Sequence, residues 1–236
     1  MSTRAGGVSR APYDSMNLGT FVGDAEDAVQ ANQRRLAERM GGAQLVFLRQ
    51  VHGTRVLNLD ELQALPQQPI EADASITTRP GHACTVTVAD CLPVLFAAPE
   101  ARGVGAAHAG WRGLAGGVLE NTVRALCEAA DCEPDQLVAW LGPCIGPRQF
   151  EVGADVVQAF GSAAGLRFRP RPGLAGKWLA DLPALARDRL SALGLSRISG
   201  GHWCTVEDAS RFFSFRRDRV TGRMAACVWL DASRSR

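Results

Sequence analysis

The sequence predicts a mixed-sheet α/β or α+β fold. Two observations favour this class: strand-like and helix-like stretches alternate irregularly along the chain, and several strand candidates lie close enough in sequence to form hairpins. A purely parallel sheet would instead require a regular alternation of strand and helix. The length of 236 residues suits one large domain or two small ones.

The first 60 residues predict a loop, a helix and two strands. Residues 1–23 read as an ordered loop of tight turns. Residues 24–40 read as a helix, because acidic residues load its first turn, arginines load its last turn and two glycines follow it. Residues 44–51 form a strand candidate, and residues 56–59 are expected to pair with it. A loop rich in proline and glutamine then covers 65–70.

Residues 83–124 form the stretch around which we expect the fold to be organised. Alternating residues from Thr85 onward predict a strand that ends at Asp90-Cys91. A second apolar run over 104–107 stops at His108. A glycine-rich turn over 110–113 and a helix follow, and we expect Glu120 and Arg124 to support this helix as a pair four residues apart.

The remaining elements are predicted from similar patterns. Residues 136–141 read as a strand, and 142–147 as a turn of proline and glycine. Residues 150–160 read as a helix, 167–176 as a polar loop and 181–193 as a helix with proline in its first turn. Residues 198–204 read as irregular. The last prediction is a hairpin of two apolar strands over 212–215 and 225–230.

Composition limits the class of protein. The net charge of +2, with 26 basic residues spread along the chain, gives no basis for nucleic-acid binding. No apolar run approaches the roughly 20 residues of a membrane span, and the N-terminus is polar, so we expect a cytoplasmic protein without membrane contact. Seven cysteines are an odd number, which argues against a disulfide framework.

Three metal-ligand residue types each end a strand candidate: His52, Cys91 and His108. Two imidazoles and one thiolate without an obvious fourth protein ligand are typical of an open catalytic zinc site. In a second interpretation, Cys91 is a nucleophile and one of the two histidines is its base. A multicopper oxidase needs many more imidazoles than the four histidines of this chain.

Two carboxylates and one turn accompany this group. Asp73 and Asp90 can orient a ligand imidazole or transfer a proton, and each can equally cap a turn or a helix. The turn over 110–113 precedes a helix, whose unpaired N–H groups would attract an anion, and Arg112 could add its guanidinium. Alternatively, the glycines only permit close packing of helix and strand.

A series of motifs resembles the YfiH family, also called the laccase-domain or multicopper polyphenol oxidase-like family. These motifs are TRAGGVS, PYDSMNLG, QVHG, ADASITT, TVADCLPVLFA, AHAGWRGLAGGVLENTV, LGPCIGPRQFEVGADV, CT and FFSFRRDRVTGR. They follow the family's order and span nearly the whole chain. The resemblance implies one domain over residues 1–236 with a four-layer α/β/β/α fold, and a zinc ion held by His52, Cys91 and His108.

The resemblance also implies purine nucleoside chemistry. The expected reactions are phosphorolysis of adenosine, guanosine, inosine or methylthioadenosine, and hydrolytic deamination of adenosine. Cys91, His108 and Asp90 are the expected catalytic residues. Arg112, with Arg216 and Arg4 as further candidates, is expected to bind substrate. Phe150 and Phe215 stand where the family commonly has tyrosine, so a phenolic hydroxyl is lost at both positions.

The leading hypothesis is therefore a zinc-dependent purine nucleoside phosphorylase with adenosine deaminase activity. It would act on nucleosides and phosphate as a monomer or homodimer. One alternative is a cysteine-dependent hydrolase of peptidoglycan precursors, because family members have also been described as peptidoglycan editing factors. The other is a non-catalytic protein in which zinc is structural.

Overall fold

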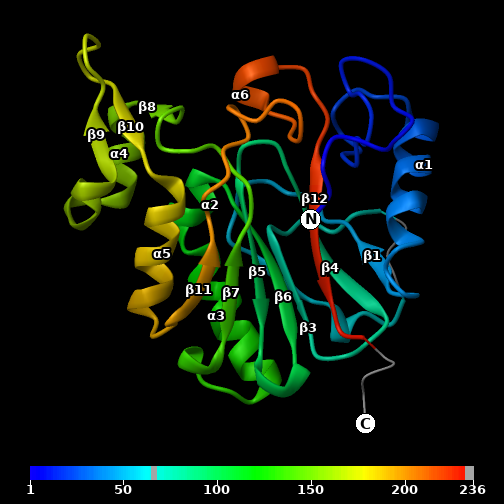
Figure 1. Cartoon of the computed structure of the whole chain (residues 1–236). Helices are drawn as coiled ribbons and strands as arrows, with labels where there is room; N and C mark the ends of the chain where they lie inside the picture. The colour runs from blue at the N-terminus through cyan, green and yellow to red at the C-terminus, as the bar shows by residue number, and fades with distance from the viewer. Residues whose placement is uncertain (65–67, 232–236) are drawn as a thin grey trace.

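Two sheets packed face to face form the centre of the molecule. The computed structural model describes residues 1–64 and 68–231 (Figure 1). The first sheet has the order β1-β4-β12 and comprises β1 (Gln44–Val46), β4 (His82–Val88) and β12 (Met224–Trp229). The second has six strands, β11 (Arg197–Gly200), β7 (Val138–Leu141), β5 (Leu92–Ala97), β6 (Val104–Ala109), β3 (Ala74–Thr77) and β2 (Val56–Asn58), in that order.

Helices cover the outer faces of these two sheets. Figure 1 shows α1 (Glu26–Ala37) beside the first sheet and α3 (Val118–Ala130) and α5 (Leu182–Ala192) on the far side of the second. The side chain of Leu36 on α1 packs in the apolar clusters that contain Ala83 of β4 and Ala225 of β12, both strands of the first sheet. The mixed α/β class and the α/β/β/α layering predicted from sequence are therefore confirmed.

The remaining elements are short. They are the helices α2 (Trp111–Gly116), α4 (Ala154–Phe160) and α6 (Phe215–Asp218), and a third sheet of β8 (Glu151–Val152), β10 (Trp178–Ala180) and β9 (Phe168–Pro170). Within the described part of the chain, no helix combines the length and the apolar character needed to cross a lipid bilayer.

Two apolar layers hold the sheets and helices together. Between the sheets lie Val46 and Val86 from the first and Val104 and Ala106 from β6. The larger core lies between the six-stranded sheet and α3 and α5. Its members include Ile76, Val94, Phe96, Leu119, Val123, Leu126, Leu185 and Leu190. The helical spacing of 119, 123 and 126 gives α3 one continuous apolar face, which explains why it packs flat on the sheet.

The N-terminal predictions hold for the helix but not for the strand pairing. The predicted helix over 24–40 corresponds to α1, and the predicted strand over 44–51 ends at Val46. The expected pair of 44–51 with 56–59 is wrong, because β1 pairs with β4 and β2 pairs with β3, both in parallel. Of the expected loop over 65–70, residues 65–67 lie outside the described residues.

The central stretch contains a strand that the sequence patterns missed. Residues 92–97 form β5, which lies between β7 and β6 in the larger sheet. Cys91 therefore lies in the turn between two sheets. His108 lies inside β6 instead of after it. The expected Glu120–Arg124 pair is also wrong, because the carboxylate of Glu120 pairs with Arg189 on α5 at 2.6 Å.

The C-terminal predictions were partly wrong. The helix over 181–193 is confirmed as α5, and Asp181 caps its first turn by accepting from the backbone N–H of Ala184 at 3.0 Å. Residues 150–160 contain the strand β8 before α4, and the region expected to be irregular begins with β11. The hairpin over 212–215 and 225–230 does not form, since β12 pairs antiparallel with β4 instead. β11 and β12 each pair with a strand that is distant in the sequence, so local patterns did not predict these pairings.

Candidate metal centre

The three predicted ligands meet at one point of the molecule. His52 follows β1, Cys91 lies between β4 and β5, and His108 belongs to β6. Their potential ligand atoms all lie within 4.8 Å of one another. The thiol sulfur of Cys91 is 3.7 Å from Nε2 of His52, and the two imidazole rings stand edge to face with centroids 4.9 Å apart. Residues 56 positions apart in sequence thus share one small volume.

Asp73 holds the loop that carries His52. This carboxylate is fully buried and accepts hydrogen bonds from the backbone N–H groups of Val51 at 3.1 Å, His52 at 2.9 Å and Gly53 at 2.7 Å. His52 has a φ of 61°, a conformation that is costly for a residue other than glycine. The three hydrogen bonds compensate for this cost and direct the imidazole toward the other two ligands.

Asp73 also orients the second imidazole. Nδ1 of His108 lies 2.8 Å from Oδ1 of Asp73, so Nδ1 carries the proton and Nε2 is left to face Cys91 and His52. Burial opposes ionisation of Asp73, but the hydrogen bond and charge of His108 lower its pKa overall. The carboxylate is therefore the outer partner that fixes the tautomer of a ligand imidazole, as one of the two interpretations of the sequence predicted.

The charges of Cys91 and His108 stabilise each other. Burial alone would raise the pKa of the Cys91 thiol, but His108 and His52 lower it to about 6. Burial alone would lower the pKa of His108, but Cys91 and Asp73 raise it to about 9. The protein thus favours a thiolate at Cys91 at neutral pH, and the thiolate is the form that ligates metals and acts as a nucleophile.

Asp90 shapes the turn that presents Cys91. Its φ is 93°, its Oδ1 accepts from the hydroxyl of Thr205 at 2.6 Å, and its Oδ2 accepts from the backbone N–H of Arg216 at 2.6 Å. Arg216 is in the first turn of α6, so Asp90 caps that helix and joins it to the turn. Both carboxylate oxygens are committed to these contacts, which corresponds to the capping interpretation of the sequence.

Gly110 leaves the space in which the ligands meet. A Cβ at this position would lie 2.8 Å from Cδ2 of His52 and 3.0 Å from the sulfur of Cys91. The first distance is shorter than carbon atoms approach in proteins, and the second is tighter than an ordinary contact, so both side chains would have to shift. Gly110 is therefore required by close packing against His52 and Cys91. The predicted turn over 110–113 is wrong in its extent, because residues 111–113 already belong to α2 and only Gly110 precedes that helix.

The donor set fits a tetrahedral metal ion. Ligand atoms around tetrahedral zinc lie about 3.3–3.8 Å apart, because zinc bonds are about 2.0–2.3 Å long. The 3.7 Å separation of the Cys91 sulfur and Nε2 of His52 matches this range, and all the ligand-atom separations are within 4.8 Å. The stabilised thiolate of Cys91 is the form that a metal binds, and the hydrogen bond from Nδ1 of His108 to Asp73 leaves Nε2 as the ligating nitrogen once a metal displaces its proton. Three protein ligands leave one coordination position open.

The three ligands line a cavity of about 350 Å³. Its other walls come from residues 18–22 of the N-terminal loop, residues 47, 48, 50 and 69, residues 87–89 at the end of β4, Phe215 and Arg223. Gln50 connects two of these walls, because its side chain forms hydrogen bonds with the backbone and the hydroxyl of Thr87 at 2.8–2.9 Å. Phe21 and Phe215 are 71% and 47% exposed and form the mouth of the cavity.

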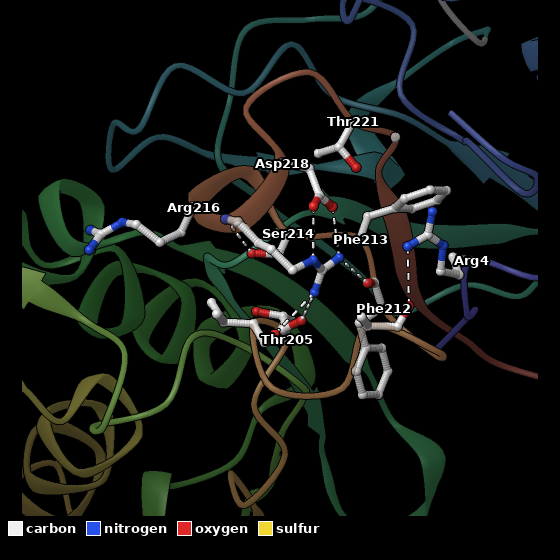
Figure 2. A network of polar contacts seen from close by, with 12 residues as sticks. Arg4, Thr205, Phe212, Phe213, Ser214, Arg216, Asp218 and Thr221 are labelled. Atoms are coloured by element: carbon white, nitrogen blue, oxygen red, sulfur yellow. Dashed lines mark hydrogen bonds and ion pairs between the residues drawn. The ribbon is translucent and has the colours of Figure 1, made fainter. Parts of the chain in front are cut away.

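The predicted substrate-binding arginines lie elsewhere. Arg112 is exposed and its guanidinium lies 4.3 Å from the centroid of the Trp111 ring. Arg4 binds the carbonyl oxygen of Ala209, and Figure 2 shows it next to Phe213. Arg216 points away from the network in Figure 2 and donates to the carbonyls of residues 149 and 151. Arg112, Arg4 and Arg216 do not line the cavity.

The arginine that does line the cavity, Arg223, was missed. It is the last residue of the motif FFSFRRDRVTGR. The motif also contains arginines at 216, 217 and 219, so the sequence alone does not single out Arg223. Arg217 has a structural role, because it donates to the carbonyls of Thr205 and Phe212 and pairs with Asp218. The sequence signal was present in the motif, but only the fold distinguishes its members.

Comparison with known proteins gives consistent results. A family model described as multi-copper polyphenol oxidoreductase laccase matches residues 1–231. A Haemophilus influenzae protein named purine nucleoside phosphorylase is 46% identical over 98% of this chain and 93% of its own length. Escherichia coli purine nucleoside phosphorylase YfiH is 48% identical over 97% of this chain and 92% of its own length.

Solved structures share the whole fold. The crystal structure of a Neisseria meningitidis protein has a TM-score of 0.91 and 45% identity, and covers 98% of this chain and 92% of that chain. The crystal structure of YlmD from Geobacillus stearothermophilus has a TM-score of 0.88 and 34% identity, and covers 97% of this chain and 89% of that chain.

Proposed function

This chain belongs to the YfiH family, described as multi-copper polyphenol oxidoreductase laccase, and we propose that it is a zinc-dependent purine nucleoside phosphorylase. The observation that carries the proposal is the convergence of His52, Cys91 and His108 on one cavity in a chain that shares 46–48% identity with enzymes of that name. The cavity is in the range that small-molecule sites occupy, about 300–1,000 Å³.

Zinc fits this site better than copper. Two imidazoles and a thiolate also occur in single-copper electron-transfer sites, but a multicopper oxidase requires several further imidazole ligands. The chain has four histidines, and His52 and His108 are the two that line the cavity. The laccase part of the family description therefore has no counterpart in the donor residues of this chain.

The residues of the cavity support phosphorolysis in separate ways. Bound zinc would supply a Lewis acid at the floor of the cavity, held by His52, Cys91 and His108. Asp73 keeps the Nδ1 proton on His108 and so keeps Nε2 directed to the floor. Phe21 and Phe215 offer aromatic faces at the mouth, where a purine base can stack. A base held there leaves its ribose between the mouth and the floor.

We propose adenosine, guanosine, inosine and methylthioadenosine as the substrates of phosphorolysis, and deamination of adenosine as a secondary reaction. Zinc deaminases use a carboxylate as general acid and base. In the described part of the chain, no Asp or Glu lines the cavity, and both oxygens of Asp90 already accept hydrogen bonds. We therefore expect phosphorolysis to be the faster reaction.

Seven free cysteines suit a cytoplasmic enzyme.

The direct test is incubation of metal-replete protein with adenosine, with and without phosphate, followed by chromatography and metal analysis. We expect adenine and ribose 1-phosphate only when phosphate is present, a small amount of inosine in both reactions, and about one zinc per chain. Protein that contains zinc but releases neither adenine nor inosine would contradict the proposal.

One observation favours a second function. Cys91, His108 and Asp73 form a series of nucleophile, base and orienting carboxylate, as in cysteine hydrolases, which could act on peptidoglycan precursors. The second imidazole at 3.7 Å from the sulfur favours the metal instead. Chelation should abolish zinc-dependent phosphorolysis and spare a thiol hydrolase, whereas alkylation of metal-free protein should abolish the hydrolase.

A non-catalytic zinc protein makes a different prediction. If the metal were purely structural, Cys91→Ser should unfold the chain. The two large apolar cores lie between layers of the fold and do not depend on the metal ligands. We therefore expect the variant to keep its circular dichroism spectrum and cooperative melting while it loses turnover.

A further inference from the structure

Arg223 is a cation in the wall of the cavity, and it makes no ion pair with a carboxylate of the described residues. It lines the same cavity as the three metal-ligand candidates. Ion pairs between arginine and carboxylate are numerous in the described residues, but none of them involves Arg223. Nη1 of its side chain donates to the carbonyl oxygens of Thr221 at 2.9 Å and Gly222 at 3.1 Å.

The position of Arg223 is fixed on several sides. Its backbone N–H donates to Oδ1 of the buried Asn17 at 2.8 Å, and its carbonyl accepts from the N–H of Leu18 at 3.0 Å. Its aliphatic stem packs against Gly19, where an added Cβ would lie 2.6 Å from Cγ of Arg223. The guanidinium also lies 5.9 Å from the centroid of the Phe215 ring. Little freedom remains to be lost when a ligand binds.

The surroundings of Arg223 favour a bound anion. Burial lowers the pKa of its guanidinium, and the charges of Cys91 and Asp90 act in the opposite direction. The guanidinium is charged at any physiological pH, so its partial removal from water lowers the stability of the folded protein. An anion that enters the cavity would compensate for this cost, because a planar guanidinium binds the oxygens of phosphate with two hydrogen bonds.

We propose that Arg223 binds the free inorganic phosphate that attacks the nucleoside. The proposal rests on the phosphorylase function proposed above. The other candidate arginines are unsuited to this role, because Arg4, Arg112 and Arg216 do not line the cavity. Phosphate at Arg223 lies in the same cavity as a nucleoside between the aromatic mouth and the metal floor.

The reaction balances with these components. A phosphate oxygen bonds to C1′ of the ribose while the bond from C1′ to the purine nitrogen breaks. The bonding electron pair leaves with the purine, and the proton that hydrogen phosphate loses ends on the purine. Arg223 transfers no atom. Its N–H groups hold the phosphate and neutralise charge that would otherwise repel the Cys91 thiolate.

The test compares Arg223→Gln and Arg223→Lys with Arg124→Gln, which removes the same charge from an exposed site on α3. Phosphorolysis is measured at saturating adenosine while phosphate is varied, and phosphate binding is measured by calorimetry in phosphate-free buffer. For Arg223→Gln we expect the KM for phosphate to rise roughly 10- to 100-fold, with the KM for adenosine nearly unchanged. The lysine variant should lie in between, and Arg124→Gln should match the wild type.

The outcomes separate this inference from the proposed function. If the wild type forms ribose 1-phosphate and Arg223→Gln keeps the same KM for phosphate, the phosphate site is wrong and the phosphorylase stands. If the wild type is inactive but binds phosphate only when Arg223 is present, the anion site stands and the phosphorylase fails. Adenosine 5′-monophosphate is titrated in parallel. Binding of this nucleotide through Arg223, without binding of inorganic phosphate, would overturn the assignment to free phosphate.

Arg223→Lys keeps the test decisive if the glutamine variant folds poorly, since lysine retains the charge and most of the stem that packs on Gly19. Each variant is first matched to the wild type in zinc content and melting temperature. An unchanged KM for phosphate in a well-folded lysine variant would count against the two-hydrogen-bond contact that the proposal requires.

Discussion

A cysteine lies near each end of β4, and the pKa values of the two thiols are shifted in opposite directions. Cys84 lies near the start of the strand, is fully buried, and burial raises its pKa to about 12. Cys91 lies three residues beyond the end of the strand, and although burial also acts on it, His108 and His52 lower its pKa to about 6. Cys84 is a small apolar core residue, whereas Cys91 is a thiolate ready for a metal.

The difference comes from neighbouring elements and not from β4 itself. At the Cys84 end, the surroundings are apolar side chains from β6 and β12, such as Val104 and Ala226. At the Cys91 end, β6 supplies His108 and the loop after β1 supplies His52. The reactivity of a cysteine in this fold is therefore decided by the imidazoles that other segments place beside it.

The largest expected effect comes from substitution of Cys91. Cys91→Ser removes the metal's thiolate ligand, so phosphorolysis and stoichiometric zinc should both be lost, by more than the roughly 100-fold that loss of an outer partner costs. Turnover and zinc content are the measurements. Cys84→Ser is the matched control and should keep both, and an equal loss in the two variants would contradict the distinction between the ends of β4.

Asp73→Asn should have the next largest effect. An amide in place of the carboxylate loses the charge that supports His108 and the fixed proton on Nδ1, so zinc affinity should fall roughly 10- to 100-fold. Competition with a chromophoric chelator measures this affinity. Asp60→Asn, the same substitution in the contacts of Thr77 and Thr78, should leave zinc affinity unchanged.

Cys84→Ser should change stability instead of function. The carbonyl oxygen of Val104 lies 3.9 Å from the sulfur, which is too far for a hydroxyl hydrogen bond, and the other polar group beside the thiol is the buried hydroxyl of Ser75. A hydroxyl costs more to bury than a thiol, so the free energy of unfolding should fall by about 1–3 kcal/mol. Urea denaturation measures this loss, and an unchanged midpoint would show that the Cys84 end tolerates polar groups.

The smallest effect is expected from the pH dependence of Asp60, which lies at the Cys84 end and contributes to the high pKa of that thiol. Burial opposes ionisation of Asp60, but hydrogen bonds from Thr77 and Thr78 lower its pKa below 3.8. Because the folded pKa is below the unfolded one, its stabilisation is complete above pH 4 and is lost as pH falls through the folded value.

Comparison of wild type and Asp60→Asn therefore isolates this contribution. The variant should be less stable by about 1 kcal/mol near pH 7, and the difference should shrink below pH 4. The urea midpoint at a series of pH values is the measurement. A constant difference from pH 7 to pH 3 would mean that the loss reflects packing and not the charge of the carboxylate.

Much of the metal site was predictable from the sequence, because each ligand follows or lies within a short apolar strand run. His52, Cys91 and His108 were identified in this way, and Asp73 was identified as a possible orienting group. Arg223 was not, since nothing local distinguishes it from the neighbouring arginines of its motif. Its place in the cavity depends on contacts with Asn17 and Gly19, about 200 residues earlier in the chain.

The fold was predictable in class and only partly in pairing. The helices over 24–40 and 181–193 have charge and capping signals of their own, so local sequence was sufficient. The strand β5 was missed because its apolar run follows β4 after a turn of three residues, and only the positive φ of Asp90 directs the chain from one sheet into the other. Pairing depends on such long-range geometry.

The bare backbone at Gly110 makes the metal centre sensitive to a change that touches no ligand. A methyl group there would occupy the point where the His52 ring and the Cys91 sulfur come together. An alanine at this position would therefore push two ligands apart while the donor atoms, their charges and their protonation all stay the same. The geometry of a metal ion held by these residues would therefore depend on the missing side chain at residue 110 as well as on the ligands themselves.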